Sequence, residues 1–280
     1  MSIAENLAGI RNRIAETARS CGRDSASIKL IAVSKTKPIG DILEAVNAGQ
    51  LAFGENYAQE LRDKAKQVSE ALPATSHQPP VTGFEWHYIG HLQKNKIKYV
   101  LPVASWIHTI DSVELLEEIV KKTNPPSPPF TKGGNSIFPP LKKGGRGGFS
   151  LINCLIEVNI AGESAKSGVS PENVFDLVDS FSTYAPFDSP SLAQGMLKHS
   201  DTYALALRGL MCMPPFSDNP ETSRPYFKKL KNLLDEINSR SIYPEKLTEL
   251  SMGMTQDFEV AIEEGATMVR IGSAIFGERQ

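Results

Sequence analysis

Lys35 is the residue whose place in the sequence most clearly suggests chemistry. The apolar run Leu30–Val33 predicts a buried strand, and Ser-Lys-Thr-Lys-Pro follows it at 34–38. Most lysines are solvated on the surface, whereas this one would direct its amine to whatever lies beyond the strand. Partial burial and the neighbouring cation Lys37 would lower the pKa of the amine and make it a better nucleophile. The alternative is a structural lysine that closes the strand or pairs with Glu55.

Two glycine-containing segments near the C-terminus are candidates for binding a phosphate. "LSMGMT" at 250–255 supplies a serine hydroxyl and backbone amides before a predicted helix, and "RIGSAIFG" at 270–277 supplies glycine amides and a second hydroxyl. Backbone amides at the start of a helix favour an anion. Glycines that only make turns would give the same pattern, so each segment alone is a weak indication.

The elements that would position these residues alternate between strand and helix. Apolar runs predict strands at 28–34, 51–54, 84–90, 105–110, 151–160, 205–211, 247–253 and 267–277, the last with a turn. Helical periodicity predicts helices at 3–20, 39–49, 57–72, 92–101, 112–122, 171–181, 222–240 and 257–265, with Gly49 as a stop, Ser112 as an N-cap and Pro171 in a first turn. Strands that are apolar throughout are typical of a parallel sheet buried on both faces. Eight such units predict a single (β/α)8 barrel over residues 1–280. An open doubly wound sheet would show fewer strands and a glycine-rich first turn.

In a (β/α)8 barrel the functional residues lie at the C-terminal ends of the strands, and the loops after strands seven and eight are the usual phosphate site. Lys35 and both glycine segments would therefore meet at one face. A lysine opposite a phosphate site can form a Schiff base with an aldehyde that also carries a phosphate, and pyridoxal 5'-phosphate (PLP) has both groups. A sugar-phosphate enzyme that forms a Schiff base with its substrate would use the same arrangement.

The composition limits the class of protein. Thirty Lys and Arg against 32 Asp and Glu give a net charge of −2, so no basic field favours nucleic acid. No run approaches the ~18 apolar residues of a membrane span. The N-terminus is a charged amphipathic pattern and not a signal peptide, so we expect a cytoplasmic protein. The thiols at Cys21, Cys154 and Cys212 are far apart and show no metal-ligand spacing.

Residues 124–149 interrupt the alternation. They contain an imperfect repeat, "PPFTKGG" and "PPLKKGG", and are dense in Pro, Gly and Lys or Arg. Such a composition buries too little apolar surface to order itself, which predicts a flexible insert on the side away from the functional face. The segments 73–83 and 184–203 are milder loop expansions of the same kind.

Several motifs, in order along the chain, resemble those of the pyridoxal phosphate homeostasis (YggS-like, PROSC) family. They are "LIAVSKTKP", "FGENYAQE", "EWHYIGHLQKNK", "HTID", "SAKSG", "LRGLMCMPP", "LSMGMTQDFEVAI" and "TMVRIGSAIFG". The resemblance covers the chain except the insert and the expanded loops. It implies an alanine-racemase-like barrel, known as fold type III among PLP proteins, which agrees with the strand count.

The resemblance also implies a set of cofactor-binding residues. Lys35 would hold PLP as a Schiff base. The phosphate would be bound by Ser251, Gly253, Met254, Gly272 and Ser273. Arg270 would face the pyridine nitrogen and keep it unprotonated, which weakens the ring as an electron sink. Asn56 would lie close to the ring, and His91, Lys94 and Met211 would line the mouth.

Catalysis would need more than these residues. A racemase uses a base on each side of the substrate α-carbon, and Lys35 supplies only one. Tyr57 is conceivable as the second, although an aromatic residue there is more often packing. The resemblance implies a PLP carrier without a defined reaction, which keeps free PLP low and releases it to PLP-dependent apoenzymes. We expect this carrier to be a monomer. The alternative is a PLP-dependent amino-acid racemase or aldolase.

Overall fold

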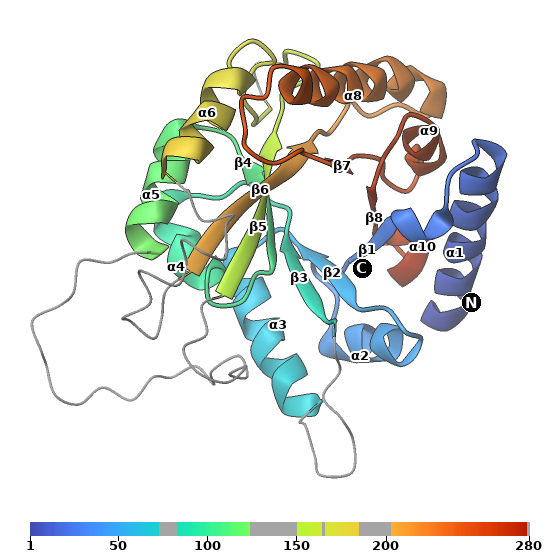
Figure 1. Ribbon diagram of the computed structural model, residues 1–280. Helices are drawn as coiled ribbons and strands as arrows, with labels where there is room; N and C mark the ends of the chain where they lie inside the picture. The colour runs from blue at the N-terminus through green and yellow to red at the C-terminus, as the bar shows by residue number, and fades with distance from the viewer. Residues whose placement is uncertain (73–82, 124–149, 164–165, 185–202, 279–280) are drawn as a thin grey trace, which may run out of the picture.

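The strands form a closed parallel barrel with the helices around its outside (Figure 1). The computed structural model describes residues 1–72, 83–123, 150–163, 166–184 and 203–278. The strands are β1 (Lys29–Val33), β2 (Ala52–Glu55), β3 (Glu85–Tyr88), β4 (Trp106–Ile110), β5 (Ser150–Glu157), β6 (Tyr203–Met211), β7 (Glu249–Ser251) and β8 (Met268–Ile271). Each strand pairs with the next, and β8 pairs with β1 to close the ring. This confirms the predicted (β/α)8 barrel.

The helices follow the predicted pattern with two corrections. They are α1 (Ile3–Ser20), α2 (Ile39–Asn47), α3 (Ala58–Ala71), α4 (Ile97–Val100), α5 (Val113–Thr123), α6 (Val174–Tyr184), α8 (Arg224–Ser239), α9 (Phe258–Glu263) and α10 (Ser273–Phe276), with 3-10 turns η1 (Ser25–Ser27), η2 (Lys94–Lys96) and η3 (Pro220–Ser223). The helix predicted at 92–101 is only the short η2–α4 pair. Pro171 lies before α6 and not in its first turn. Ser112 does cap α5, because its hydroxyl accepts from the Leu115 amide.

Side chains alternate between two separate cores. The larger core lies between the strands and the helices and includes the buried face of α1. A small apolar cluster lies inside the barrel and consists of Ile31, Ala52, Trp106, Leu155, Met211 and Met268. Residues two positions from these along a strand also point inward. They include the polar residues Lys29, His108, Glu157 and Arg270. The barrel interior therefore contains both an apolar cluster and buried polar side chains.

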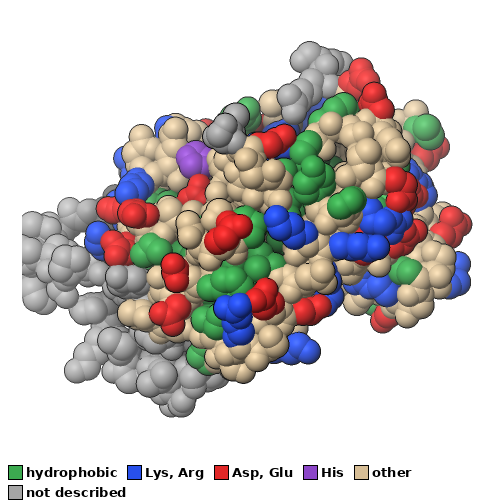
Figure 2. Space-filling model, turned by 90° about the horizontal axis from the view of Figure 1, so that it is seen from above, with side chains coloured by type: hydrophobic (Ala, Val, Ile, Leu, Met, Phe, Trp, Pro, Cys, Tyr) green, Lys and Arg blue, Asp and Glu red, His purple; other side chains and the backbone are tan. Residues whose placement is uncertain are grey.

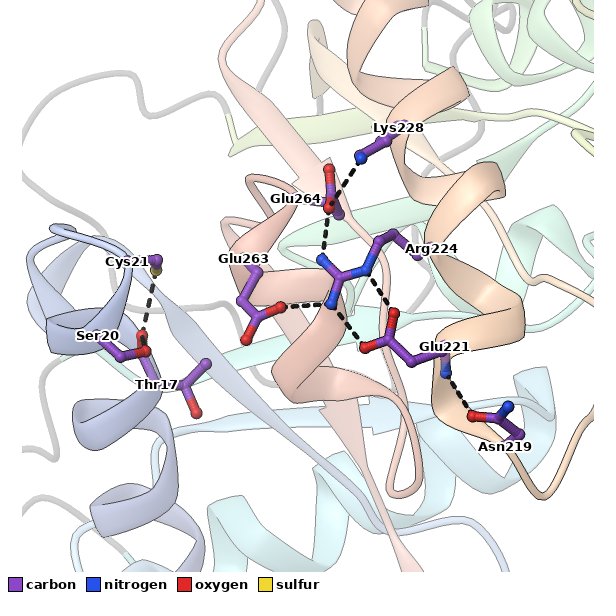
Figure 3. A network of polar contacts seen from close by, with 9 residues as sticks. All are labelled: Thr17, Ser20, Cys21, Asn219, Glu221, Arg224, Lys228, Glu263 and Glu264. Carbon is purple, nitrogen blue, oxygen red and sulfur yellow. Dashed lines mark hydrogen bonds and ion pairs between the residues drawn. The ribbon is translucent and has the colours of Figure 1, made fainter.

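Arg224 joins the last helices of the ring. Its guanidinium donates to Glu221 in η3 and, at 2.6 Å each, to Glu263 and Glu264 at the end of α9 (Figure 3). These hydrogen bonds raise the pKa of Arg224. On the other side of α9, α1 lies beside α10, and Asn6 Nδ2 donates to the Ile275 carbonyl at 2.9 Å. The helices after β7 and β8 are thus fixed on both sides.

The predicted insert at 124–149 lies outside the described residues, as do nearly all of the loop expansions predicted at 73–83 and 184–203. In the sequence the insert connects the end of α5 to the start of β5. The starts of the strands lie on the side of the barrel opposite the functional face. In the part of the chain that is described, no helix is long and apolar enough to cross a membrane. Figure 2 shows positive and negative side chains interspersed over one face of the molecule, in keeping with the small net charge.

Substituting Gly209 by alanine tests the close approach of β6 and β7. A Cβ at Gly209 would lie 1.8 Å from the Glu249 carbonyl oxygen, so the two strands would have to separate. We expect Gly209→Ala to lower the free energy of unfolding by more than about 2 kcal/mol in urea denaturation. Gly9→Ala is the control: it has open space in α1 and should raise stability by up to about 1 kcal/mol. An equal change in the free energy of unfolding in the two variants would contradict the close approach of β6 and β7.

Candidate functional site

Lys35 lies in the turn that follows β1 and is half-buried. The next residue, Thr36, has a φ of 64°, in the left-handed region. That conformation is unusual for a β-branched residue and costs about 1–3 kcal/mol. The turn therefore keeps its shape only because the surrounding structure holds it.

A charged cluster from β2 and α3 holds the residues on both sides of Lys35. Ser34 Oγ donates to Glu55 Oε1 at 2.7 Å, and Lys64 Nζ donates to the Ser34 carbonyl at 2.6 Å. The Thr36 amide donates to Glu60 Oε1 at 2.6 Å. Lys64 ties the two carboxylates together, at 2.8 Å from Glu55 and 2.6 Å from Glu60. The backbone that carries Lys35 is thus fixed from two directions.

Glu55 is fully buried, and burial raises the pKa of its carboxyl while the charge of Lys64 opposes that rise. The sequence left open a structural role in which Lys35 pairs with Glu55. In the structure Lys64 is an ion-pair partner of Glu55. Lys37, proposed to lower the pKa of Lys35, directs its amine to the carbonyl oxygens of Phe276 and Glu278, each at 2.9 Å. It therefore links the Lys35 turn to the end of α10.

The predicted phosphate segments lie side by side. The Arg270 amide donates to the Gly253 carbonyl at 3.0 Å, which joins the segment after β7 to β8. The hydroxyls of Thr255 and Ser273 are 3.4 Å apart. Gly272 lies against the end of β1, because a Cβ there would be 3.2 Å from the Val33 carbonyl oxygen. The structure thus brings both segments to the same end of the barrel as the Lys35 turn.

The segment after β7 is held in one shape by a glycine and a carboxylate. Gly253 has a φ of 91°, and a Cβ there would lie 2.6 Å from that of Ala261. Only glycine fits both the backbone conformation and the space. Asp257 Oδ1 accepts from the Met254 amide at 2.7 Å, and its other oxygen accepts from Ser223 Oγ at 2.8 Å. The backbone at Gly253 and Met254 is therefore fixed before any ligand binds.

The side chains of Ser251 and Arg270 point into the barrel interior. Ser251 is fully buried, and its hydroxyl contacts Arg270 Nη1 at 2.6 Å and His108 Nδ1 at 2.9 Å. Arg270 also donates to the Cys212 carbonyl at 3.0 Å, and burial lowers the pKa of its guanidinium. The predicted phosphate contact of Ser251 stays a prediction, while Thr255 supplies a hydroxyl at the mouth that the sequence analysis did not single out.

A pocket of about 330 Å³ opens at the same end of the barrel. Its lining includes the predicted Asn56, Met254 and His91, together with Glu157 and Lys166. Asn56 Oδ1 and Glu157 Oε2 are buried and have no hydrogen-bond partner among the described residues. A donor-bearing ligand would satisfy both atoms. Of the other residues predicted at the mouth, Lys94 is exposed in η2 and Met211 belongs to the apolar cluster inside the barrel.

Glu157 is a site residue that the sequence analysis missed. Its side chain is 3% exposed. Burial and the charge of Asp111 raise the pKa of its carboxyl to about 7, although the charge of Arg270 lowers that pKa in part. The signal was present: Glu157 is the acidic residue within a long apolar strand. A larger pocket of about 530 Å³ lies at the opposite end of the barrel, near Arg11 and Lys29, and contains none of the predicted site residues.

Comparisons with known proteins agree with this geometry. The family model described as alanine racemase, N-terminal domain, matches residues 6–280. A pyridoxal phosphate homeostasis protein of Aquifex aeolicus is 36% identical over 280 residues, 100% of both chains. The protein of that name from Escherichia coli K12 is 38% identical over 277 residues, 99% of this chain and 97% of the relative. The structure of PipY of Synechococcus elongatus with PLP bound is similar with a TM-score of 0.66 at 26% identity, covering 99% of this chain and 100% of PipY.

The chain therefore belongs to the alanine racemase N-terminal domain family and, within it, to the pyridoxal phosphate homeostasis proteins.

Removing the amine of Lys64 tests the cluster that holds the Lys35 turn. Lys64→Met would leave Glu55 buried without its ion-pair partner, and we expect a loss of about 3 kcal/mol in the free energy of unfolding. Lys66→Met is the control on the same helix, since Lys66 is 68% exposed and pairs with Glu70 at 3.9 Å. It should change stability by less than about 0.5 kcal/mol. Similar losses in both variants would show that the cluster does not stabilise the turn.

The raised pKa of Glu157 predicts a pH dependence of stability. Between about pH 4.5 and 7 the folded protein holds a proton on Glu157 that the unfolded chain has lost, so stability falls as the pH rises. Without added ligand, the free energy of unfolding of the wild type should fall from pH 5 to pH 8 by about 2–3 kcal/mol more than that of Glu157→Gln. Urea denaturation at both pH values measures this difference, and an equal change in the two proteins would contradict it.

Proposed function

We propose that this chain binds PLP at the mouth of the barrel, bonds its aldehyde to Lys35, and holds it for release to PLP-dependent apoenzymes. The observation that carries the proposal is the meeting of the fixed Lys35 turn with the segments after β7 and β8 at one end of the barrel. The homeostasis proteins among the relatives and the PLP bound to PipY support it.

The residues at the mouth fit this cofactor. A pocket of about 330 Å³ is large enough for a small ligand. The hydroxyls of Thr255 and Ser273 and the nearby backbone amides suit a phosphate. PLP supplies an aldehyde that a lysine amine captures reversibly.

Each predicted residue other than Ser251, whose phosphate contact stays a prediction, has a part in the proposal. Lys35 is the nucleophile. The phosphate contacts come from Gly253, Met254, Gly272 and Ser273, with Thr255 added. Arg270 faces the pyridine nitrogen, and Asn56 lies at the ring. In this proposal the protein is a cytoplasmic monomer that holds PLP without transforming amino acids; Tyr57, the conceivable second base, is 58% exposed and so is not held in the site by packing.

The absorbance spectrum of the protein with PLP tests this proposal. We expect a band near ~420 nm that borohydride abolishes, with the label on the peptide that contains Lys35. Lys35→Ala should give no reducible label, whereas Lys66→Met, on an exposed face of α3, should be labelled like the wild type. The absence of a band with PLP added, or a label on another lysine, would contradict the proposal.

A further inference from the structure

A chain of polar contacts crosses the barrel interior from its N-terminal end to Arg270. Glu85 Oε2 lies 2.5 Å from Lys29 Nζ and 3.3 Å from His87 Nε2. His87 Nδ1 lies 2.9 Å from His108 Nε2. The chain continues from His108 Nδ1 to the hydroxyl of Ser251 and on to Arg270, as described above.

Both ends of this chain have a fixed hydrogen-bonding role. Arg270 can only donate, so the Ser251 oxygen accepts from it. At the other end the Glu85 carboxylate can only accept when ionised. Burial would raise the pKa of Glu85, but the hydrogen bonds from His87 and Lys29 and the charge of Lys29 outweigh burial and lower it. Glu85 is therefore ionised at neutral pH.

Arg270 at one end and Glu85 at the other determine the direction of every hydrogen bond between them. The Ser251 proton points to His108 Nδ1, so the His108 proton is on Nε2 and points to His87. The His87 proton is in turn on Nε2 and points to Glu85. The opposite direction would leave the Ser251 proton without an acceptor and set the bare His87 Nε2 against a carboxylate.

Both histidines are fully buried, which favours their neutral forms. Burial lowers the pKa of His87, against the hydrogen bond and charge of Glu85. Burial also lowers the pKa of His108, and the charges of Arg270 and Lys29 act in the same direction. His87 stacks on Trp106 with ring planes 6° apart, which holds its orientation. Packing thus holds the ring plane, and the hydrogen bonds determine the tautomer.

We propose that this one-directional chain positions Arg270 and leaves Ser251 without a proton to donate to a phosphate. Ser251 and His108 are positioning residues for the guanidinium, and the phosphate hydroxyls are those of Ser273 and Thr255. The consequence for the cofactor rests on the proposed function, whereas the direction of the chain does not.

Nitrogen-15 NMR of the histidine side chains tests the direction of these hydrogen bonds in the intact protein without ligand. We expect two of the five imidazoles to stay neutral and protonated on Nε2 from pH 5.5 to 8. Ser251→Ala should shift the Nδ1 resonance of His108, whereas Thr123→Val, which removes a buried hydroxyl in α5, should not. A charged or Nδ1-protonated His87 or His108 at pH 7, or an unchanged His108 in Ser251→Ala, would overturn the proposal.

Comparing PLP with pyridoxal, which lacks the phosphate, tests the role of Ser251. Loss of a phosphate contact weakens PLP alone, so Ser273→Ala should reduce the preference for PLP by roughly tenfold. Ser251→Ala should weaken both ligands by the same factor, because Arg270 faces the ring. A reduced preference of Ser251→Ala for PLP over pyridoxal would overturn the proposed role of Ser251. If neither ligand binds the wild type, the proposed function fails and the NMR result alone decides the direction of the chain.

Discussion

The buried guanidinium of Arg270 is the group on which the barrel interior depends. Moving an unpaired charge out of water costs several kcal/mol, so the interior must supply acceptors. It does so through Ser251 and the Cys212 carbonyl, and through two histidines that lead to Glu85 at the far end. The polar side chains inside the barrel follow from this requirement.

The Lys35 turn is fixed by a different mechanism on the outer side of the barrel. Ser34 and Glu55 point toward the helices, where Lys64 binds the turn to α3. A reactive lysine needs a fixed backbone, and the cluster that holds the flanking residues provides it. The closed parallel barrel then brings this turn and the segments after β7 and β8 to one end, although they lie near opposite ends of the sequence.

Much of this arrangement could be predicted from the sequence, because strand periodicity and motif order are local properties. The eight strands, the lysine after β1 and the glycine segments follow from such patterns. The chain of polar contacts inside the barrel does not follow from such patterns. Glu85, His87 and His108 lie on strands whose inward faces depend on barrel closure. The placement of Ser251 away from the loop also depends on the exact end of β7, and Pro171 was misplaced because helix starts are set by tertiary contacts.

In the proposed function the mouth of the barrel holds PLP without using it to transform amino acids. Exchange of the alanine α-proton for deuterium, followed by proton NMR in heavy water, tests this most directly. With the protein and PLP together, we expect exchange no faster than with the same concentration of PLP alone. Faster exchange that is lost in Lys35→Ala would contradict the claim and show that the site catalyses proton transfer.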